Sequence, residues 1–169
     1  RRVPDAHAVV FGTSPPKDPL PDWIEVLVDP PAEVLVAEVY NRARVFIQPS
    51  DYEGFGFTAV EAMACGAALV TTDNGGSDDY AVPDETALLT EPGDAAGLGR
   101  LADDLLVDDA RRVRLAEAGR RLVRRFDWDE SAARLEDLLE RYLADPDRFR
   151  KRPRPVPAGP EAVRATRKP

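Results

Sequence analysis

Residues 45–76, VFIQPSDYEGFGFTAVEAMACGAALVTTDNGG, decide the fold of this chain. The apolar, β-favouring run at 45–47 predicts a strand, and the Pro, Ser and Gly residues after it predict a loop. Helix-forming residues at 58–65 predict a helix that ends at Gly66. A second apolar and β-branched run, 67–72, predicts another strand. This order is typical of a parallel β-α-β unit, whose loop places backbone N–H groups at a helix N-terminus.

Two glutamates frame the loop, Glu53 before the glycines and Glu61 one turn into the helix. The glycines Gly54 and Gly56 allow the backbone to come close to a ligand. The free N–H groups of a first helical turn favour a phosphate, and a glutamate beside them can accept hydrogen bonds from sugar hydroxyls. A nucleotide-sugar offers both partners, a pyrophosphate and several hydroxyls.

A purely structural interpretation of the same residues stays open. Thr58 and Glu61 have the spacing of a capping box, in which the glutamate side chain bonds the backbone of the N-cap residue. The glycines could then serve the turn alone. Spacing does not decide between the two interpretations, since short motifs often match by accident.

The run EGFGFTAVE at 53–61, followed by AMACG at 62–66, resembles the E-x7-E signature of retaining glycosyltransferases with the GT-B fold. The likeness is greatest to the glycosyltransferase group 1 (family 4) enzymes. It extends from about Val9 to about Tyr142 and includes the turns DNGG at 73–76 and EPGD at 91–94. Several ordered motifs are more specific than one glycine loop, so the resemblance favours a functional role for both glutamates.

The resemblance implies an α/β fold, a doubly wound and mostly parallel Rossmann-like sheet with extra C-terminal helices. It corresponds to the C-terminal, donor-binding half of a GT-B enzyme, and the N-terminal acceptor domain would be missing from this chain. The implied reaction transfers a sugar from a nucleoside-diphosphate sugar to an acceptor with retention, and this fragment alone would be inactive. The resemblance implies no cofactor and no metal.

The same resemblance implies roles for individual residues. Glu53 would be the catalytic residue beside the sugar ring, and Glu61 would hydrogen-bond the ribose. A weaker candidate, Asp29, would contact the base through its backbone. The remaining donor-binding candidates lie in the two glycine turns and are Gly54, Phe55, Gly56, Phe57, Thr58, Gly75 and Gly76. Two alternatives are a non-catalytic interaction module that kept the fold and a GT-B nucleotide-sugar epimerase, although an epimerase normally relies on histidine and acidic groups that are lacking here.

Composition and charge limit the function classes. The 169 residues are 43% hydrophobic and 32% charged, and the net charge is −8. Residues 146–169 hold eight basic and two acidic residues, which gives this tail +6 and leaves −14 for residues 1–145. We therefore predict a nucleotide-sugar-binding domain over 1–145 and a flexible, Pro-rich basic tail over 146–169. An acidic body argues against nucleic acid as a ligand, whereas the tail could contact an anionic membrane or a partner.

No apolar run approaches the roughly 18 residues that cross a bilayer, and no signal peptide is visible, so we expect a cytoplasmic location, at most peripheral to the inner face of a membrane. One cysteine and one histidine make a metal site on these residues improbable.

Phe126 and Trp128 are expected as core or helix-junction anchors, and Asp127 with Glu130 as a helix cap and its third-position partner. The arginine pairs after residue 110 are expected on solvated helix faces. Further strands are expected at 8–12, 23–28 and 86–89, and helices at 32–44, at 78–82 and from 95 onward.

Overall fold

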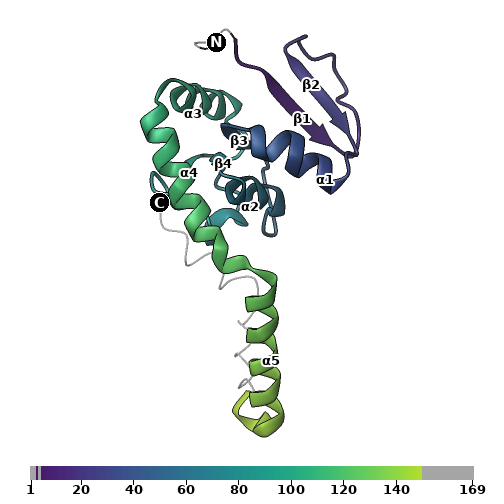
Figure 1. Ribbon diagram of the computed structural model, residues 1–169, viewed down its shortest axis with the longest axis vertical. Coiled ribbons are helices and arrows are strands. Elements are labelled where there is room, and N and C mark those ends of the chain that lie inside the picture. Colours follow the sequence, from purple (N-terminus) through teal and green to yellow (C-terminus); the bar gives the residue numbers. More distant parts are fainter. Residues whose placement is uncertain (1–2, 4, 150–169) are drawn as a thin grey trace, which may run out of the picture. The chain divides into compact units, whose positions relative to one another are not determined.

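Parallel strand pairs separated by helical segments make up residues 8–90, and helices follow from Ala95 on. The computed structural model describes residue 3 and residues 5–149 (Figure 1). The described residues form one unit up to Phe126 and a second from Asp127 on. In chain order the elements are β1 (Ala8–Gly12), β2 (Ile24–Val28), α1 (Ala32–Val34), a π-helical turn (Leu35–Val39), a 3₁₀ turn (Tyr40–Arg42), β3 (Val45–Gln48), α2 (Phe57–Ala64), β4 (Ala68–Thr72), a 3₁₀ turn (Ser77–Asp79), β5 (Ala87–Thr90), α3 (Ala95–Val107), α4 (Asp109–Val123), a 3₁₀ turn (Arg124–Phe126), α5 (Trp128–Ala144) and a 3₁₀ turn (Pro146–Phe149).

Every strand pair in the described residues is parallel. β1 pairs with β2, and β4 lies between β3 and β5 in a three-stranded sheet. The register aligns Gln48 of β3 with Thr71 of β4. The loops that follow these two strands therefore leave the sheet at the same edge, which is where ligands bind in open α/β sheets. The predicted α/β class with a parallel sheet is confirmed.

β4 is covered on both faces, as its run of apolar residues predicts for a central parallel strand. All five of its residues are buried. Leu69 packs in a cluster with the buried aromatic residues Tyr40, Phe46 and Tyr80. Its neighbours along the strand face the other way, into a cluster with the leucines of α3 and α4, namely Leu98, Leu105 and Leu115. Each large side chain buried in this way stabilises the fold by about 1.5–3 kcal/mol.

The predicted strands and the helix before Gly66 are confirmed, with ends shifted by one residue at most. The expected regular helix at 32–44 is wrong, because the segment changes from α-helical to π-helical and then to a 3₁₀ turn. Its valines are β-branched and form regular helix poorly, and the wide turn brings Val39 and Tyr40 together onto the buried side. The helix expected at 78–82 is a 3₁₀ turn at Ser77–Asp79, because the side chain of Asn74 accepts the Ser77 N–H and begins the turn early.

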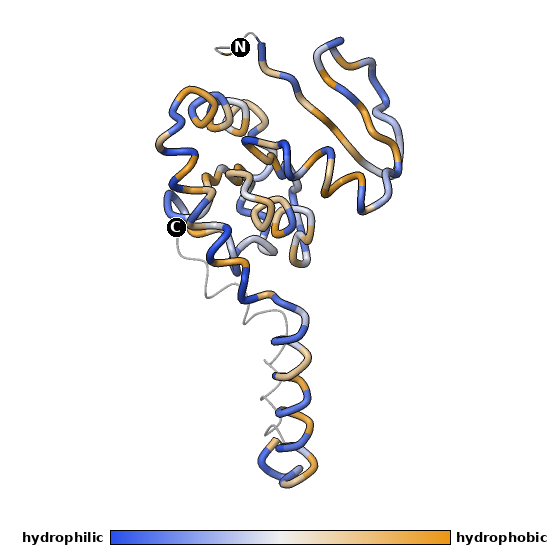
Figure 2. Tube along the Cα trace, viewed as in Figure 1, coloured by the Kyte–Doolittle hydropathy of each residue, from blue (hydrophilic) through white to orange (hydrophobic). Residues whose placement is uncertain are grey.

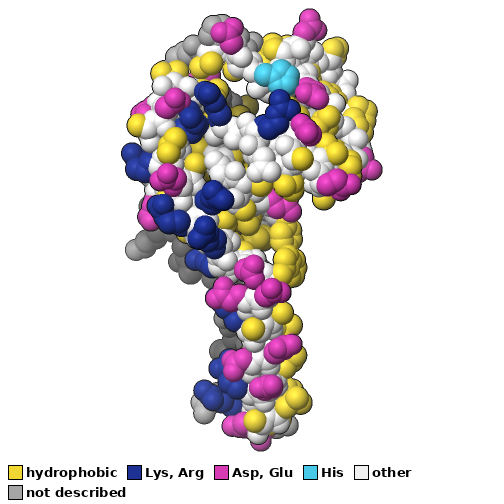
Figure 3. Space-filling model, in the orientation of Figure 1, with side chains coloured by type: hydrophobic (Ala, Val, Ile, Leu, Met, Phe, Trp, Pro, Cys, Tyr) yellow, Lys and Arg dark blue, Asp and Glu magenta, His cyan; other side chains and the backbone are white. Residues whose placement is uncertain are grey.

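Basic side chains gather over α4 (Figure 3). Arg121 is well exposed there, as predicted for a solvated helix face. The prediction is wrong for Arg112, whose side chain is only 13% exposed and pairs with Asp109. That hydrogen bond holds the pKa of the Asp109 carboxyl below its usual value. Arg111 is also partly covered and pairs with Asp84 at 2.5 Å, so this end of α4 is tied to the loop before β5.

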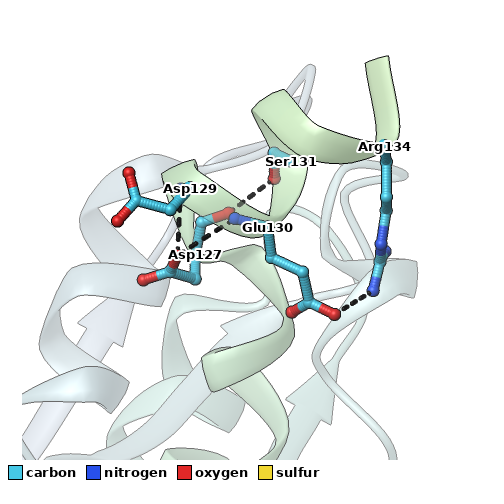
Figure 4. Close-up of polar contacts among 5 residues, drawn as sticks. All are labelled: Asp127, Asp129, Glu130, Ser131 and Arg134. Atoms are coloured by element: carbon cyan, nitrogen blue, oxygen red, sulfur yellow. Dashed lines mark hydrogen bonds and ion pairs between the residues drawn. The ribbon is translucent and has the colours of Figure 1, made fainter. Parts of the chain in front are cut away.

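The second unit consists mainly of α5, along which hydrophobic and hydrophilic residues alternate (Figure 2). Asp127 caps the helix by accepting the N–H groups of Asp129 at 2.9 Å and of Glu130 at 3.2 Å (Figure 4). The predicted cap is confirmed, but Glu130 does not complete a capping box, because its carboxylate pairs with Arg134 at 2.7 Å one turn later. Trp128 was expected as an anchor, yet it is 79% exposed because it stands on the first turn of this helix.

Two sequence-based expectations concern the ends of the chain. Among the described residues, no helix is both long enough and apolar enough to cross a bilayer. Of the basic tail, Pro146–Phe149 form a 3₁₀ turn in which Phe149 contacts Tyr142. The rest of the tail, residues 150–169, lies outside the described residues, and so does the prediction of its flexibility.

Candidate donor-binding site

The loop between β3 and α2 is held together by polar side chains. Gln48, the last residue of β3, is buried with 5% of its surface exposed. Its side-chain N–H donates to Oε1 of Glu53 at 2.8 Å, and the Ser50 hydroxyl donates to the same oxygen at 2.7 Å. At the other end of the amide, Gln48 Oε1 accepts the Thr58 hydroxyl at 3.0 Å. The Glu53 carboxylate is therefore tied to the first turn of α2 through a single side chain.

The N-terminus of α2 begins at a glycine for two reasons. Gly56 is the N-cap residue and has a left-handed backbone with φ of 86°, a conformation that other residues adopt at a cost. A Cβ at this position would also collide with the hydroxyl of Tyr80. No described residue accepts the backbone N–H groups of Phe57 and Thr58. These donors, with the helix dipole behind them, form an arrangement that can bind an anion.

The capping-box interpretation of Thr58 and Glu61 is wrong. The N-cap position belongs to Gly56, and Thr58 lies inside the helix with its hydroxyl directed to Gln48. Glu61 is exposed on the next turn. Its negative charge raises the pKa of two neighbouring groups, the Tyr40 hydroxyl and the Cys65 thiol. For both groups burial is the larger cause of the raised pKa and Glu61 the second. The carboxylate is thus free of a capping role.

The second glycine turn packs directly against the first. The backbone N–H of Glu53 donates to the carbonyl of Asn74 at 3.1 Å. The Asn74 side chain, which is buried, accepts the N–H groups of Gly76 at 3.2 Å and Ser77 at 3.1 Å. A Cβ on Gly76 would lie 2.8 Å from the Glu53 carbonyl oxygen and 2.8 Å from the Phe55 nitrogen. The structure therefore brings the two predicted turns into contact.

The side chain of Phe55 anchors the loop between β3 and α2 by packing against three aromatic rings. Its ring meets those of Phe57, Tyr80 and Phe126 edge to face, with centroids 5.1, 5.6 and 5.1 Å away. Phe126 is thus a packing anchor, as the sequence predicts. Phe55 itself contributes to the site through its backbone, since its ring is occupied by these contacts.

Asp29 stands apart from this arrangement. It follows β2, is exposed, and has φ of 48°. Its N–H donates to the carbonyl of Gly12 at 2.8 Å, which closes the turn after the β1–β2 pair. None of the contacts among the described residues joins Asp29 to either glycine turn. Glu61 and Glu53 also share no contact there.

Four residues of the site were missed by sequence reasoning: Gln48, Ser50, Asn74 and Tyr80. A signal for Gln48 was available, because strand alternation places it on the same face as the buried Phe46. A buried amide needs partners on both its ends. Among the described residues, no group of three or more His, Cys, Asp or Glu side chains could hold a metal ion, and the expectation of a metal-independent enzyme stays a prediction.

The buried hydroxyl of Tyr80 gives the first testable prediction. It has no hydrogen-bond partner among the described residues, and burial followed by the charge of Glu53 raises its pKa from 10.0 to about 12. A pKa that is higher in the folded state favours the folded protein below pH 10, and this contribution is lost as the pH rises toward 12. We expect the free energy of unfolding of the wild type to fall over this range by on the order of 2 kcal/mol more than that of Tyr80→Phe.

Urea unfolding followed by circular dichroism at pH 8, 10 and 11.5 measures this difference. At pH 8 the Tyr80→Phe protein should equal or exceed the wild type in stability, because the substitution removes an unpaired buried hydroxyl. Tyr52→Phe is the matched control, since Tyr52 is 82% exposed. Parallel losses in wild type and Tyr80→Phe above pH 10 would contradict the prediction.

Comparison with known proteins places this geometry in a family. Residues 2–122 match the profile of the glycosyl transferases group 1. The chain belongs to that family. A glycosyl transferase group 1 match over this range includes both glycine turns and all the strands, so the resemblance predicted from EGFGFTAVE is confirmed.

Individual members of the glycosyl transferases group 1 and solved structures agree with this assignment. The chain is 40% identical over 114 residues to a D-inositol 3-phosphate glycosyltransferase of Xylanimonas cellulosilytica, a match covering 67% of this chain and 27% of that protein. A sucrose-phosphate synthase structure from Thermosynechococcus elongatus superposes with a TM-score of 0.71 at 31% identity, covering 80% of this chain and 38% of the other. The C-terminal domain of a group 1 glycosyl transferase from Francisella tularensis gives a TM-score of 0.54 at 29% identity, covering 60% and 52%.

The coverage shows that the chain corresponds to a portion of these proteins. It spans about a quarter of the length of the curated relatives it matches. The predicted Rossmann-like α/β fold of a GT-B glycosyltransferase is confirmed by the sucrose-phosphate synthase superposition, in which this chain covers 38% of the other.

Proposed function

We propose that this chain is the donor-binding part of a retaining glycosyltransferase that uses a nucleoside-diphosphate sugar. The observation that carries the proposal is the contact of the two glycine turns at the N-terminus of α2, where the N–H groups of Phe57 and Thr58 have no acceptor among the described residues. The names of its relatives, which transfer glycosyl groups or synthesise sucrose phosphate, support the same class of reaction.

The chemistry of glycosyl transfer explains the arrangement. As the bond between the sugar and the diphosphate breaks, negative charge grows on the departing diphosphate, and fixed donors at a helix N-terminus stabilise that charge. In this proposal the backbone at Gly56, Phe57 and Thr58 binds the diphosphate. Glu53 lies beside the sugar, with one carboxylate oxygen held by Gln48 and Ser50. No metal ion is required for these steps.

Glu61 accepts hydrogen bonds from the ribose in the proposed complex. Its exposure and its lack of a capping role support this assignment. Gly75 and Gly76 form the wall of the site opposite α2, and Asp29 is a second-rank candidate for contact with the base. The acceptor would be bound by a separate N-terminal domain, so the proposal predicts donor binding, not turnover, for this chain alone.

Isothermal titration of the chain with UDP, GDP and ADP, and with the glucose conjugate of each, tests the proposal. We expect saturable binding of at least one nucleotide and its conjugate. Glu61→Ala should weaken that binding by about tenfold, the effect of losing one or two hydrogen bonds to a charged group. Its free energy of unfolding should change by less than about 0.5 kcal/mol, because Glu61 caps nothing.

The matched control is Glu136→Ala, which removes an exposed carboxylate from α5. It should bind the same nucleotide as tightly as the wild type does. Flat heats with all six compounds would overturn the proposal and favour the alternative of an interaction module. Conversion of the bound sugar nucleotide to an epimer, measured by NMR, would favour the epimerase alternative.

A further inference from the structure

The amide of Gln48 is used at both ends inside the site. Its nitrogen donates to Oε1 of Glu53 at 2.8 Å, and its oxygen accepts the Thr58 hydroxyl at 3.0 Å. The amide cannot be turned around, because its oxygen would then face a carboxylate that has no proton to donate. Gln48 is also 5% exposed, so water cannot easily replace either bond. The orientation of the amide is therefore fixed by its partners.

This fixed amide leaves the two oxygens of Glu53 unequal. Oε1 receives two hydrogen bonds, from Gln48 and Ser50. Oε2 receives none from the described residues. The carboxylate is therefore held by one oxygen, and the other is left to accept a hydrogen bond from a ligand.

Gln48 also links Glu53 to the anion-binding end of α2. Through Thr58, the same side chain is bonded to the first turn of the helix, next to the N–H groups of Phe57 and Thr58, for which the described residues supply no acceptor. The position of a sugar beside Glu53 relative to a diphosphate bound at those N–H groups would thus depend on one side chain, that of Gln48. Small errors in such a geometry are costly, since catalytic groups must be placed within a fraction of an ångström.

We infer that Gln48 is a positioning residue, which sets the carboxylate of Glu53 against the N-terminus of α2 and so determines recognition of the sugar half of the donor. The inference rests on the proposed function for its ligand. It predicts a division of effects: loss of the Gln48 amide disturbs the sugar contacts of Glu53 and leaves the nucleotide contacts intact. A residue that only fills space in the core would affect both halves alike.

The test compares Gln48→Met, which keeps the length and removes the amide, with the wild type. Isothermal titration is performed with the nucleotide that binds most tightly and with its glucose conjugate. We expect the conjugate to bind about tenfold more weakly and the nucleotide alone to change less than about twofold, because one charge-assisted contact is misplaced. Equal weakening of both ligands would overturn the inference.

A measurement without ligand separates this inference from the proposed function. Side-chain scalar couplings in NMR report whether Glu53 keeps one χ1 rotamer. We expect one rotamer in the wild type and rotamer averaging in Gln48→Met. A single rotamer in both proteins would overturn the positioning role, even if no nucleotide binds and the proposed function fails.

Two further variants keep the test decisive if Gln48→Met does not fold. Ser50→Ala removes the other donor to Oε1, and it should loosen Glu53 in the same direction. Thr58→Val removes the hydroxyl at the far end of the amide, and it should increase rotamer averaging less than Ser50→Ala does, because both donors to Oε1 of Glu53 remain. Thr58→Val with unchanged Glu53 rotamer populations would contradict the inference, because Gln48 would then not link Glu53 to the first turn of α2.

Discussion

Replacing Gly76 with alanine should lower the free energy of unfolding by about 3 kcal/mol, at the upper end of what an overpacked methyl group costs. The added Cβ would lie 2.8 Å from the carbonyl oxygen and the Cβ of Glu53 and 2.8 Å from the backbone nitrogen of Phe55. These are atoms of the facing turn and cannot rotate away as the end of a flexible side chain can. The two turns must separate, and the hydrogen bond from Glu53 N to Asn74 O is lost with their contact.

Two glycines in the same turns supply controls for this experiment. A Cβ on Gly54 would meet no atom within 4 Å, so Gly54→Ala should change stability by less than about 1 kcal/mol. Gly75 also has open space but has φ of 80°, so Gly75→Ala isolates the cost of the left-handed backbone, about 1–2 kcal/mol. Urea unfolding of the three proteins gives the comparison. If Gly76→Ala were as stable as Gly54→Ala, the turns would not be in the contact described.

The contact between the two turns marks the limit of what the sequence predicts about the site. The positions of both glycine turns were predicted, because strand, loop and helix signals between residues 45 and 76 agree with one another. Spacing could not predict which atoms meet across the turns. That Gly76 rests on Glu53 depends on the parallel register of β3 and β4, which is a property of the folded sheet.

The capping-box spacing gave a wrong prediction where the same residues can form a helix start without the box. Thr58 and Glu61 fit a capping box in sequence, but the left-handed backbone of Gly56 starts the helix two residues earlier than that motif requires. Asp127 and Glu130 fit the same motif, and there the cap forms while Glu130 bonds Arg134 instead. A capping box therefore needs both partners to lack a better bond, which the spacing does not reveal.

Buried polar residues were the other omission. In the sequence, the polar residues at the ends of β3 and β4 look like ordinary strand ends or loop residues. Nothing in the sequence indicates which groups they hydrogen-bond. In the structure the Asn74 amide donates to the Thr71 hydroxyl at 3.3 Å, and the Thr72 hydroxyl contacts the Ser50 carbonyl oxygen. The second of these contacts joins residues 22 positions apart, and it is visible only when the strands are paired. The roles proposed for Glu53, Glu61 and the glycine turns stay predictions until donor binding is measured.

Asn74 makes more of these buried hydrogen bonds than its neighbours Ser50 and Thr72 do, and Asn74→Ala should destabilise the chain by about 2–4 kcal/mol. Its side-chain oxygen accepts two buried N–H groups, those of Gly76 and Ser77, and its nitrogen donates to Thr71. Alanine leaves the N–H groups of Gly76 and Ser77 without this acceptor, where only 2% of the residue is exposed to water, while the Thr71 hydroxyl keeps its bond to the Gln48 carbonyl oxygen. A buried donor without an acceptor costs more than its hydrogen bond contributed.

The matched control is Asn41→Ala, which removes an exposed amide from the end of the segment before β3. It should cost less than about 0.5 kcal/mol. Urea unfolding measures stability, and hydrogen exchange of the Gly76 and Ser77 amides shows where it is lost: both should exchange faster in Asn74→Ala, while amides of β4 change only with global stability. Because the Asn74 carbonyl also accepts the Glu53 N–H, loosening this turn should reach the first glycine turn too. Exchange at Gly76 and Ser77 that matches the wild type would mean that the turn is held by its backbone alone.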